Sequence, residues 1–249
     1  MLHKAEGIII RTNDYGEGHK IITLYTRQWG KVGLIARGAK KLNSRLSAVT
    51  QLFTYGEYTF FKSSGLGSLN SGESIASRQK IREDLMLAAY ASYMTELFDK
   101  LTDDLDASNM LFEQLKAAFD GLESGKDPDI LMHIMEMKLL AIGGYAPQLN
   151  QCVVCNAGHG NMMLSVLLGG LMCSHCRGRD TTAFPLNEVT LKLLRLFQQV
   201  DLRRLGATDV KPSTKAQLKR CVRSLLDAHI DVRLKSRSFL DQLEKYDLS

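Results

Sequence analysis

The hydrophobic pattern of this chain changes once, near Ser74, and the change separates two kinds of structure. Before it, short β-branched and aromatic runs alternate with turns, as in the isoleucine run at residues 8–10 and the turn at residues 28–30. Such runs predict strands and hairpins. After Ser74, apolar residues recur at intervals of three and four, which predicts amphipathic helices. The chain is therefore expected to be an α+β protein.

The first part of the chain predicts a small barrel. Five strands are expected, at residues 6–12, 20–26, 30–37, 50–62 and 65–70. Five strands without a long helix between them fit a closed or nearly closed barrel, and the OB-fold is the natural candidate. Phe53, Tyr58 and Phe60 are assigned to the barrel core. Trp29 lies in a turn and is the ring expected to be exposed, either as a stacking platform for bases or as a cap on the barrel.

The remainder of the chain predicts a helical domain. We place an OB-fold domain at residues 1–78 and a helical domain at residues 79–249, with an inserted segment at residues 150–180. Asp127 and Asn187 have the position and chemistry of helix N-caps, and Pro128 suits a first helical position. His133 is assigned to helix packing rather than to a ligand set.

Charge is distributed unevenly along the chain. No Asp or Glu occurs from Gly18 to Gly56, although the chain has 27 acidic residues in 249. Cations that project from this region suit the phosphates of a polyanion, whereas the alternative is a solvated loop that happens to be basic. The residues predicted to contact nucleic acid are Lys31, Arg37, Lys40, Lys41 and Arg45.

The three parts of the chain also differ in net charge, which is +7 for residues 1–80, −8 for residues 81–150 and +6 for residues 151–249. A basic, acidic, basic order suggests basic surfaces for nucleic acid and an acidic middle that faces elsewhere or binds a basic partner. Lys215, Lys219 and Arg223 lie at four-residue intervals on one predicted helix. Such a row is either a solvated face or a surface for an anion.

Two CxxC motifs, at residues 152–155 and 173–176, are the sharpest local signal. Paired CxxC motifs at this spacing are typical of a zinc site with four thiolate ligands. Without a recognisable secretion signal, zinc is favoured over disulfides. Four sulfurs complete a tetrahedron, so one structural Zn²⁺ is predicted, with His159 and His175 as possible substitute ligands. The predicted ligands are Cys152, Cys155, Cys173 and Cys176.

Motifs of catalysis are missing from the sequence. It has no P-loop, no complete dinucleotide-binding glycine loop, no HxE and no HExxH. No apolar run reaches the length of a membrane span, and the expected compartment is the cytoplasm. A non-enzymatic protein that binds nucleic acid is predicted. The alternative is an RNA-binding or transcription-associated zinc-ribbon protein.

Several short motifs, in order, resemble those of the RecO family, the bacterial recombination mediators of DNA repair. They lie at residues 15–21, 30–32, 36–41, 44–46, 51–53, 65–67 and 234–237. The resemblance covers essentially the whole chain. His19 stands where the family usually has Asp, and Leu52 where it usually has Pro.

The resemblance implies an OB-fold joined to a helical domain that carries the zinc site. It also implies binding of single- and double-stranded DNA near the nucleoid, annealing of complementary strands, and partnership with RecR in the RecFOR pathway of DNA recombination after DNA damage. With RecR, such proteins help RecA to displace single-strand binding protein (SSB), and they contact its acidic C-terminal tail. The row at Lys215, Lys219 and Arg223 is the candidate receptor for that tail.

Overall fold

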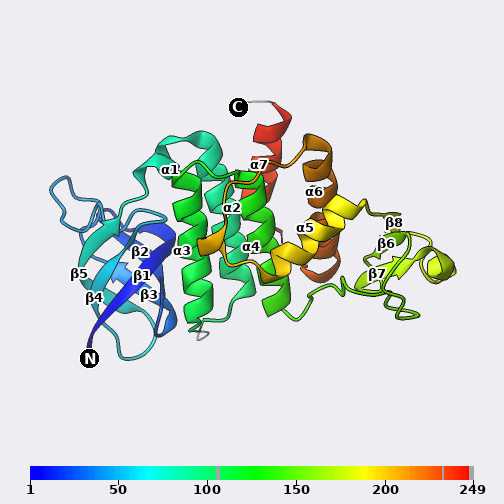
Figure 1. Ribbon diagram of the computed structural model, residues 1–249. Helices are drawn as coiled ribbons and strands as arrows, with labels where there is room; N and C mark the ends of the chain where they lie inside the picture. Colours follow the sequence, from blue (N-terminus) through cyan, green and yellow to red (C-terminus); the bar gives the residue numbers. More distant parts are fainter. Residues whose placement is uncertain (105–106, 232, 247–249) are drawn as a thin grey trace. The chain divides into compact units, whose positions relative to one another are not determined.

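The computed structural model (Figure 1) describes residues 1–104, 107–231 and 233–246. These residues fall into two compact units. The first comprises Met1–Ser124 together with helix α7 (Lys235–Lys245), and the second comprises Gly125–Leu234. The predicted domain boundary lies at residue 78 instead. The compact units divide the chain differently because the helices that follow the barrel directly pack against it.

The first unit contains a closed five-stranded barrel, as predicted. Its strands follow the order β1-β2-β3-β5-β4, and β4 pairs with β1 to close it. Strands β3 and β5 are parallel, and all other pairs are antiparallel. This is a barrel of the OB type. The strands are β1 (Leu2–Tyr15), β2 (His19–Thr26), β3 (Gly30–Ala36), β4 (Tyr55–Phe61) and β5 (Gly67–Ala76).

Apolar side chains from all five strands fill the barrel. Tyr58 and Phe60 belong to this core, and the Tyr58 hydroxyl donates a 3.0 Å hydrogen bond to the Val49 carbonyl. Phe53 is buried as predicted, but it packs against Phe119, with ring centroids 5.3 Å apart. Its ring therefore joins the barrel to the helices.

The helices of the first unit explain why β1 is apolar on both faces. Ile9 packs inside the barrel, and Ile8, on the other face, is buried as well, because helix α2 contacts β1. Tyr25 of β2 meets Phe98 of α2 edge to face at 4.7 Å. The C-terminal helix α7 packs on α2. The remaining helices of this unit are α1 (Gln79–Glu83), α2 (Leu85–Leu101) and α3 (Asn109–Glu123).

The second unit is a set of three helices, each in contact with the other two, joined to a small sheet. The predicted N-caps are confirmed, since Asp127 accepts from the backbone N–H of Asp129 and Asn187 from that of Thr190. His133 is buried, as predicted for a packing residue. The elements are α4 (Pro128–Ile142), β6 (Met162–Ser165), β7 (Gly170–Cys173), the 3-10 helix η1 (Ser174–Arg179), β8 (Phe184–Pro185), α5 (Glu188–Gln199), the 3-10 helix η2 (Leu202–Arg204) and α6 (Pro212–His229).

Candidate metal centre and nucleic-acid interface

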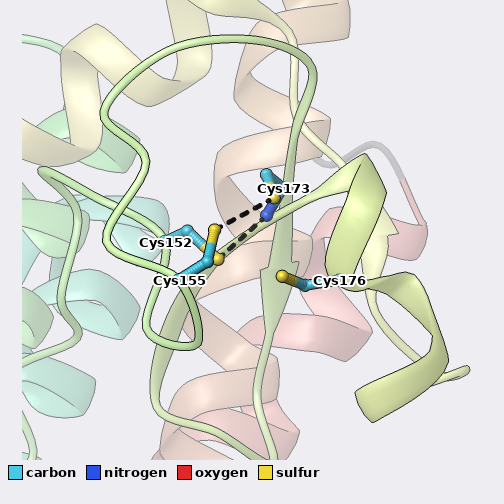
Figure 2. Close-up of side chains that lie close together, drawn as sticks. All are labelled: Cys152, Cys155, Cys173 and Cys176. Carbon is cyan, nitrogen blue, oxygen red and sulfur yellow. Dashed lines mark hydrogen bonds between the residues drawn. The ribbon is translucent and has the colours of Figure 1, made fainter.

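The four cysteines of the CxxC motifs come together in the second unit. Figure 2 shows their sulfur atoms turned toward one another, and all lie within 4.8 Å of each other. The sulfurs of Cys155 and Cys173 are 3.6 Å apart. In a tetrahedron with metal–sulfur bonds of about 2.3 Å, sulfurs lie about 3.8 Å apart. The donor set therefore fits a four-coordinate metal ion, and the predicted ligand residues are the ones that the fold assembles.

Local backbone geometry places the first pair of sulfurs. The chain turns back on itself after Cys155, because the Asn156 N–H donates to the Cys152 carbonyl at 2.9 Å and the Cys152 N–H donates to the Ala157 carbonyl at 2.8 Å. Asn156 has a φ of 61°, a left-handed conformation that Asn tolerates better than most residues. The tight turn presents both sulfurs of the first motif on one side.

The β6–β7 hairpin and η1 place the second pair. Cys173 ends strand β7, and its N–H donates to the sulfur of Cys152 at 3.4 Å. Cys176 follows within η1. Asp180, directly after η1, accepts from the hydroxyls of Ser165 and Thr182, each at 2.6 Å, and so anchors the segment to β6.

The environment of the four sulfurs favours the thiolate form of Cys152. Burial alone would raise the pKa of Cys152, but backbone N–H groups of Cys173, Cys155 and Val154 outweigh it and lower the pKa to about 6. Burial and contacts with the other three thiols raise the pKa of Cys176 to about 12. Four thiolates this close repel one another, and a bound cation removes that repulsion. The cluster found among the described residues contains no histidine.

The basic loop between β3 and β4 extends from Arg37 to Arg45. Arg37, Lys41 and Arg45 are exposed, and within the described part of the chain their side chains form no hydrogen bond or ion pair. Lys40 is also exposed, but its Nζ lies 2.6 Å from a carboxylate oxygen of Asp14. Three of the predicted cations are therefore available to phosphate, and Lys40 could exchange its exposed partner for one.

The turn between β1 and β2 holds the start of this loop in place. The Gly38 N–H donates to His19 Nδ1 at 2.9 Å, and the Lys40 N–H donates to the Gly18 carbonyl at 3.1 Å. Gly38 has a φ of 71°, which favours glycine. His19, which stands where the family usually has Asp, thus accepts a hydrogen bond from the backbone of the basic loop. The loop backbone is consequently fixed while its long side chains project into solvent.

Lys31 differs from the other predicted contacts, and its assignment needs correction. Its side chain is 5% exposed, and its Nζ lies 3.2 Å from Asp99 Oδ1. The same ammonium group donates to the carbonyls of Asp99 and Thr102. Lys31 therefore joins the barrel to helix α2 and is not available to a phosphate. Proximity in sequence to the basic loop suggested otherwise, because the acidic partner lies 68 residues further along the chain.

The predicted partner-binding row lies on α6 in the second unit. Lys215 is half-buried, and its Nζ lies 2.5 Å from Asp127 and 3.2 Å from Asp129. Lys219 and Arg223 are half-buried too, and each has partners of its own. An acidic peptide at this row would have to compete with carboxylates of the same unit. The row stays a prediction.

Two basic residues that the sequence analysis did not single out have notable surroundings in the first unit: one forms buried ion pairs and the other lines a hollow. Arg78 is 3% exposed and forms ion pairs with Asp120 at 2.6 Å and Glu123 at 2.7 Å. Lys62, at the end of β4, lines a hollow that also includes Arg37. Neither belongs to a motif. Arg78 meets its partners only when helix α3 packs beside it, and Lys62 meets Arg37 only when the barrel folds, so no local signal could have identified them.

A closed OB-type barrel with an exposed basic loop, followed by helices and a four-cysteine cluster, defines a class of α+β proteins with two parts. Comparison with known proteins narrows the class. Residues 1–78 match the family model described as Recombination protein O N terminal, and residues 82–238 match Recombination protein O C terminal. No helix among the described residues has the length and apolar character needed to cross a membrane.

Curated relatives agree over nearly the full length. Proteins named DNA repair protein RecO from Halalkalibacterium halodurans and from Bacillus subtilis are 48% and 47% identical to this chain over 244 residues. Each alignment covers 98% of this chain and 96% of the relative. This chain belongs to the RecO family of DNA repair proteins.

Proposed function

We propose that this chain is a non-enzymatic recombination mediator that binds single- and double-stranded DNA through its barrel. The observation that carries the proposal is the exposed, carboxylate-poor loop from Arg37 to Arg45 beside a closed OB-type barrel. Unpaired cations on a fixed backbone neutralise phosphates without reading base sequence. The interface comprises Arg37, Lys40, Lys41 and Arg45.

Strand annealing follows from the same electrostatics. Masking phosphate charge on two strands lowers their mutual repulsion, and holding both strands on one protein raises their local concentration. With RecR, the protein would then promote loading of RecA onto DNA coated with SSB, in the cytoplasm where the nucleoid lies. The family membership supports these partners, and the SSB tail would bind the helical part of the chain.

We further propose that the ion held by the four cysteines is Zn²⁺. Four thiolates favour Zn²⁺ among the common divalent ions and leave no position for a substrate or water. The metal would therefore hold the fold of the segment around residues 150–180 and take no part in catalysis.

The salt dependence of DNA binding tests the interface. Replacing Arg37, Lys41 and Arg45 with Ala should weaken binding and lower the slope of log affinity against log salt by about 2 for single strands. A control variant with the same net charge, with Lys100, Lys211 and Lys245 replaced by Ala, should keep the slope. An equal slope in the first variant and the wild type would remove the loop from the interface.

Two functional assays separate the proposal from its alternatives. The protein should accelerate annealing of complementary strands coated with SSB, and the loop variant should do so less. Affinity for single-stranded DNA should equal or exceed affinity for RNA of equal length and sequence. A marked preference for RNA, with no annealing activity, would instead favour an RNA-binding role.

A further inference from the structure

A hollow of about 360 Å³ opens beside the turn between β2 and β3, which contributes Gln28 and Trp29 to its lining. This volume lies in the range of small-molecule sites, about 300–1,000 Å³. Its lining combines three rings with basic and polar groups, and includes no Asp or Glu. The lining residues are His3, Gln28, Trp29, Lys31, Val32, Phe60, Lys62 and Ser63.

The three rings of the hollow support one another. Trp29 meets His3 at 5.1 Å between ring centroids and Phe60 at 5.9 Å, with interplanar angles of 70° and 87°. The backbone N–H of Trp29 donates a hydrogen bond to the hydroxyl of Thr26 at 3.0 Å, which fixes the turn. Trp29 nevertheless remains 40% exposed. An edge-on ring held by two others leaves part of its face available for a further flat group.

A second hollow, of about 220 Å³, adjoins the first. Lys62 and Ser63 line both, and Arg37, the first residue of the basic loop, lines the second. Lys62 Nζ donates to the Gly65 carbonyl at 2.9 Å, and no carboxylate of the described residues forms an ion pair with it. The lining of the second hollow also lacks Asp and Glu. A path of uncompensated positive charge therefore leads from the ring hollow to the basic loop.

We propose that the ring hollow accepts an unstacked base of single-stranded DNA against Trp29, while the adjoining phosphates pass Lys62 toward Arg37. An aromatic face next to a basic track is the arrangement that suits single strands, because every base offers a flat face for stacking. Bases of a duplex are already stacked and paired, so they cannot enter. This inference rests on the proposed function and adds the element that distinguishes single strands from duplex.

Trp29 provides its own probe, because it is the only tryptophan of the chain. Titration with a short oligothymidylate should quench its fluorescence, and a duplex of equal length should quench it much less. Replacing Trp29 with Leu should weaken binding of the labelled oligothymidylate roughly 10-fold, as loss of one stacked base implies. Duplex affinity and the salt slope should stay as in the wild type.

Matched variants separate stacking from folding. Trp29→Phe should retain most of the affinity for oligothymidylate, because it keeps a ring, and Tyr246→Leu, which removes an exposed ring on the tail of the chain, should have no effect. Should Trp29→Leu not fold, quenching in the wild type decides the question. Absence of quenching by oligothymidylate at saturating DNA overturns the inference.

Three further outcomes are informative. If an acidic peptide quenches Trp29 and oligothymidylate neither quenches nor competes with it, the hollow is a peptide site and the inference is wrong. If the basic-loop variant lowers the salt slope while Trp29 does not respond to DNA, the proposed function stands and only the base-stacking site is rejected. If the basic-loop variant keeps the salt slope of the wild type and Trp29 does not respond to DNA, the barrel is rejected as the DNA-binding surface.

Discussion

The Nζ atom of Lys31 in strand β3 lies 3.2 Å from the carboxylate of Asp99 in helix α2, and both side chains are largely buried. Removing Lys31 leaves the largely buried Asp99 carboxylate with the half-exposed Arg11, 3.5 Å from its other oxygen, and takes the ammonium donor away from the carbonyls of Asp99 and Thr102. Lys31→Ala should therefore lower the free energy of unfolding by about 3–5 kcal/mol, measured by urea denaturation. At temperatures where the variant is folded, its salt slope for DNA binding should equal that of the wild type.

The control for Lys31 is Lys41, an exposed lysine of the basic loop. Lys41→Ala should leave the free energy of unfolding within about 0.5 kcal/mol of the wild type and should lower the salt slope by about 0.7 for single strands. The opposite pattern, a stable Lys31→Ala variant with a reduced slope, would place Lys31 in the DNA interface after all.

Arg78 supplies the second prediction. Its guanidinium group is buried and pairs with Asp120 and Glu123 of α3. Arg78→Ala should lower the free energy of unfolding by about 1–3 kcal/mol, because the buried guanidinium group loses two charge-assisted hydrogen bonds whose carboxylates remain partly exposed to solvent. Arg78→Lys should recover only part of the loss, since a single ammonium cannot reproduce the geometry of the guanidinium fork.

Lys116, a half-buried cation near the same carboxylates, provides the comparison. Lys116 pairs with Asp120 at 3.4 Å within one helix. Lys116→Ala should cost no more than about 0.5 kcal/mol. Urea denaturation could instead show the same small loss in the free energy of unfolding for Arg78→Ala and Lys116→Ala. The ion pairs of Arg78 would then not be the interaction that attaches α3 to the segment before α1.

Sequence reasoning succeeded where the signal is local. The CxxC spacing identified four cysteines that the fold brings within 4.8 Å, and the period change identified the barrel and the helices. It missed what depends on distant partners. Lys31 resembles its basic neighbours until Asp99 is seen beside it, and the ring hollow combines side chains from three strands and a turn. Charge along a sequence does not show which charges are already paired.

Lys215 yields a prediction that depends on pH. Burial alone would lower the pKa of Lys215, but contacts with Asp127 and Asp129 outweigh it and raise the pKa above its ordinary value of 10.5. A raised pKa in the folded state means that the ion pairs stabilise fully below pH 10.5 and are lost as the pH rises through the folded pKa. Lys215→Met should therefore cost about 1 kcal/mol at neutral pH.

The difference between Lys215→Met and the wild type should shrink toward zero once the pH exceeds the folded pKa, as measured by urea denaturation across the alkaline range. Lys192, whose pair with Glu188 is largely exposed, is the control. Lys192→Met should have little effect at any pH. A cost for Lys215→Met that persists in strong alkali would mean that packing of the side chain, and not its charge, stabilises the unit.

The α6 row can be tested with the peptide that it is predicted to bind. Lys219→Ala combined with Arg223→Ala should weaken binding of an isolated SSB tail peptide several-fold, because the double variant removes two positive charges from the helix face that the acidic peptide would contact. Lys215→Met should weaken it less, since Asp127 and Asp129 already engage that lysine. Equal affinities of the double variant and the wild type, measured by fluorescence anisotropy, would dismiss this row as the receptor.

The cysteine cluster gives the last prediction. Purified protein should contain about one zinc per chain, since four thiolates form one closed site. Cys173→Ser should lose the metal, and hydrogen exchange at residues 145–185 should become faster, because this segment has little core of its own without the ion. Cys221, buried in α6 outside the cluster, is the matched control. Cys221→Ser should keep both the metal and the slow exchange.

Acid should have the same effect as losing a ligand, because protons compete with the metal for sulfur. Zinc should be retained at neutral pH and released as the pH falls, with faster exchange at residues 145–185 accompanying the release. The rest of the chain should keep its protection in Cys173→Ser, since the barrel core contains none of these residues. Slow exchange throughout a metal-free protein would falsify the structural role, because the segment would then be stable without the ion.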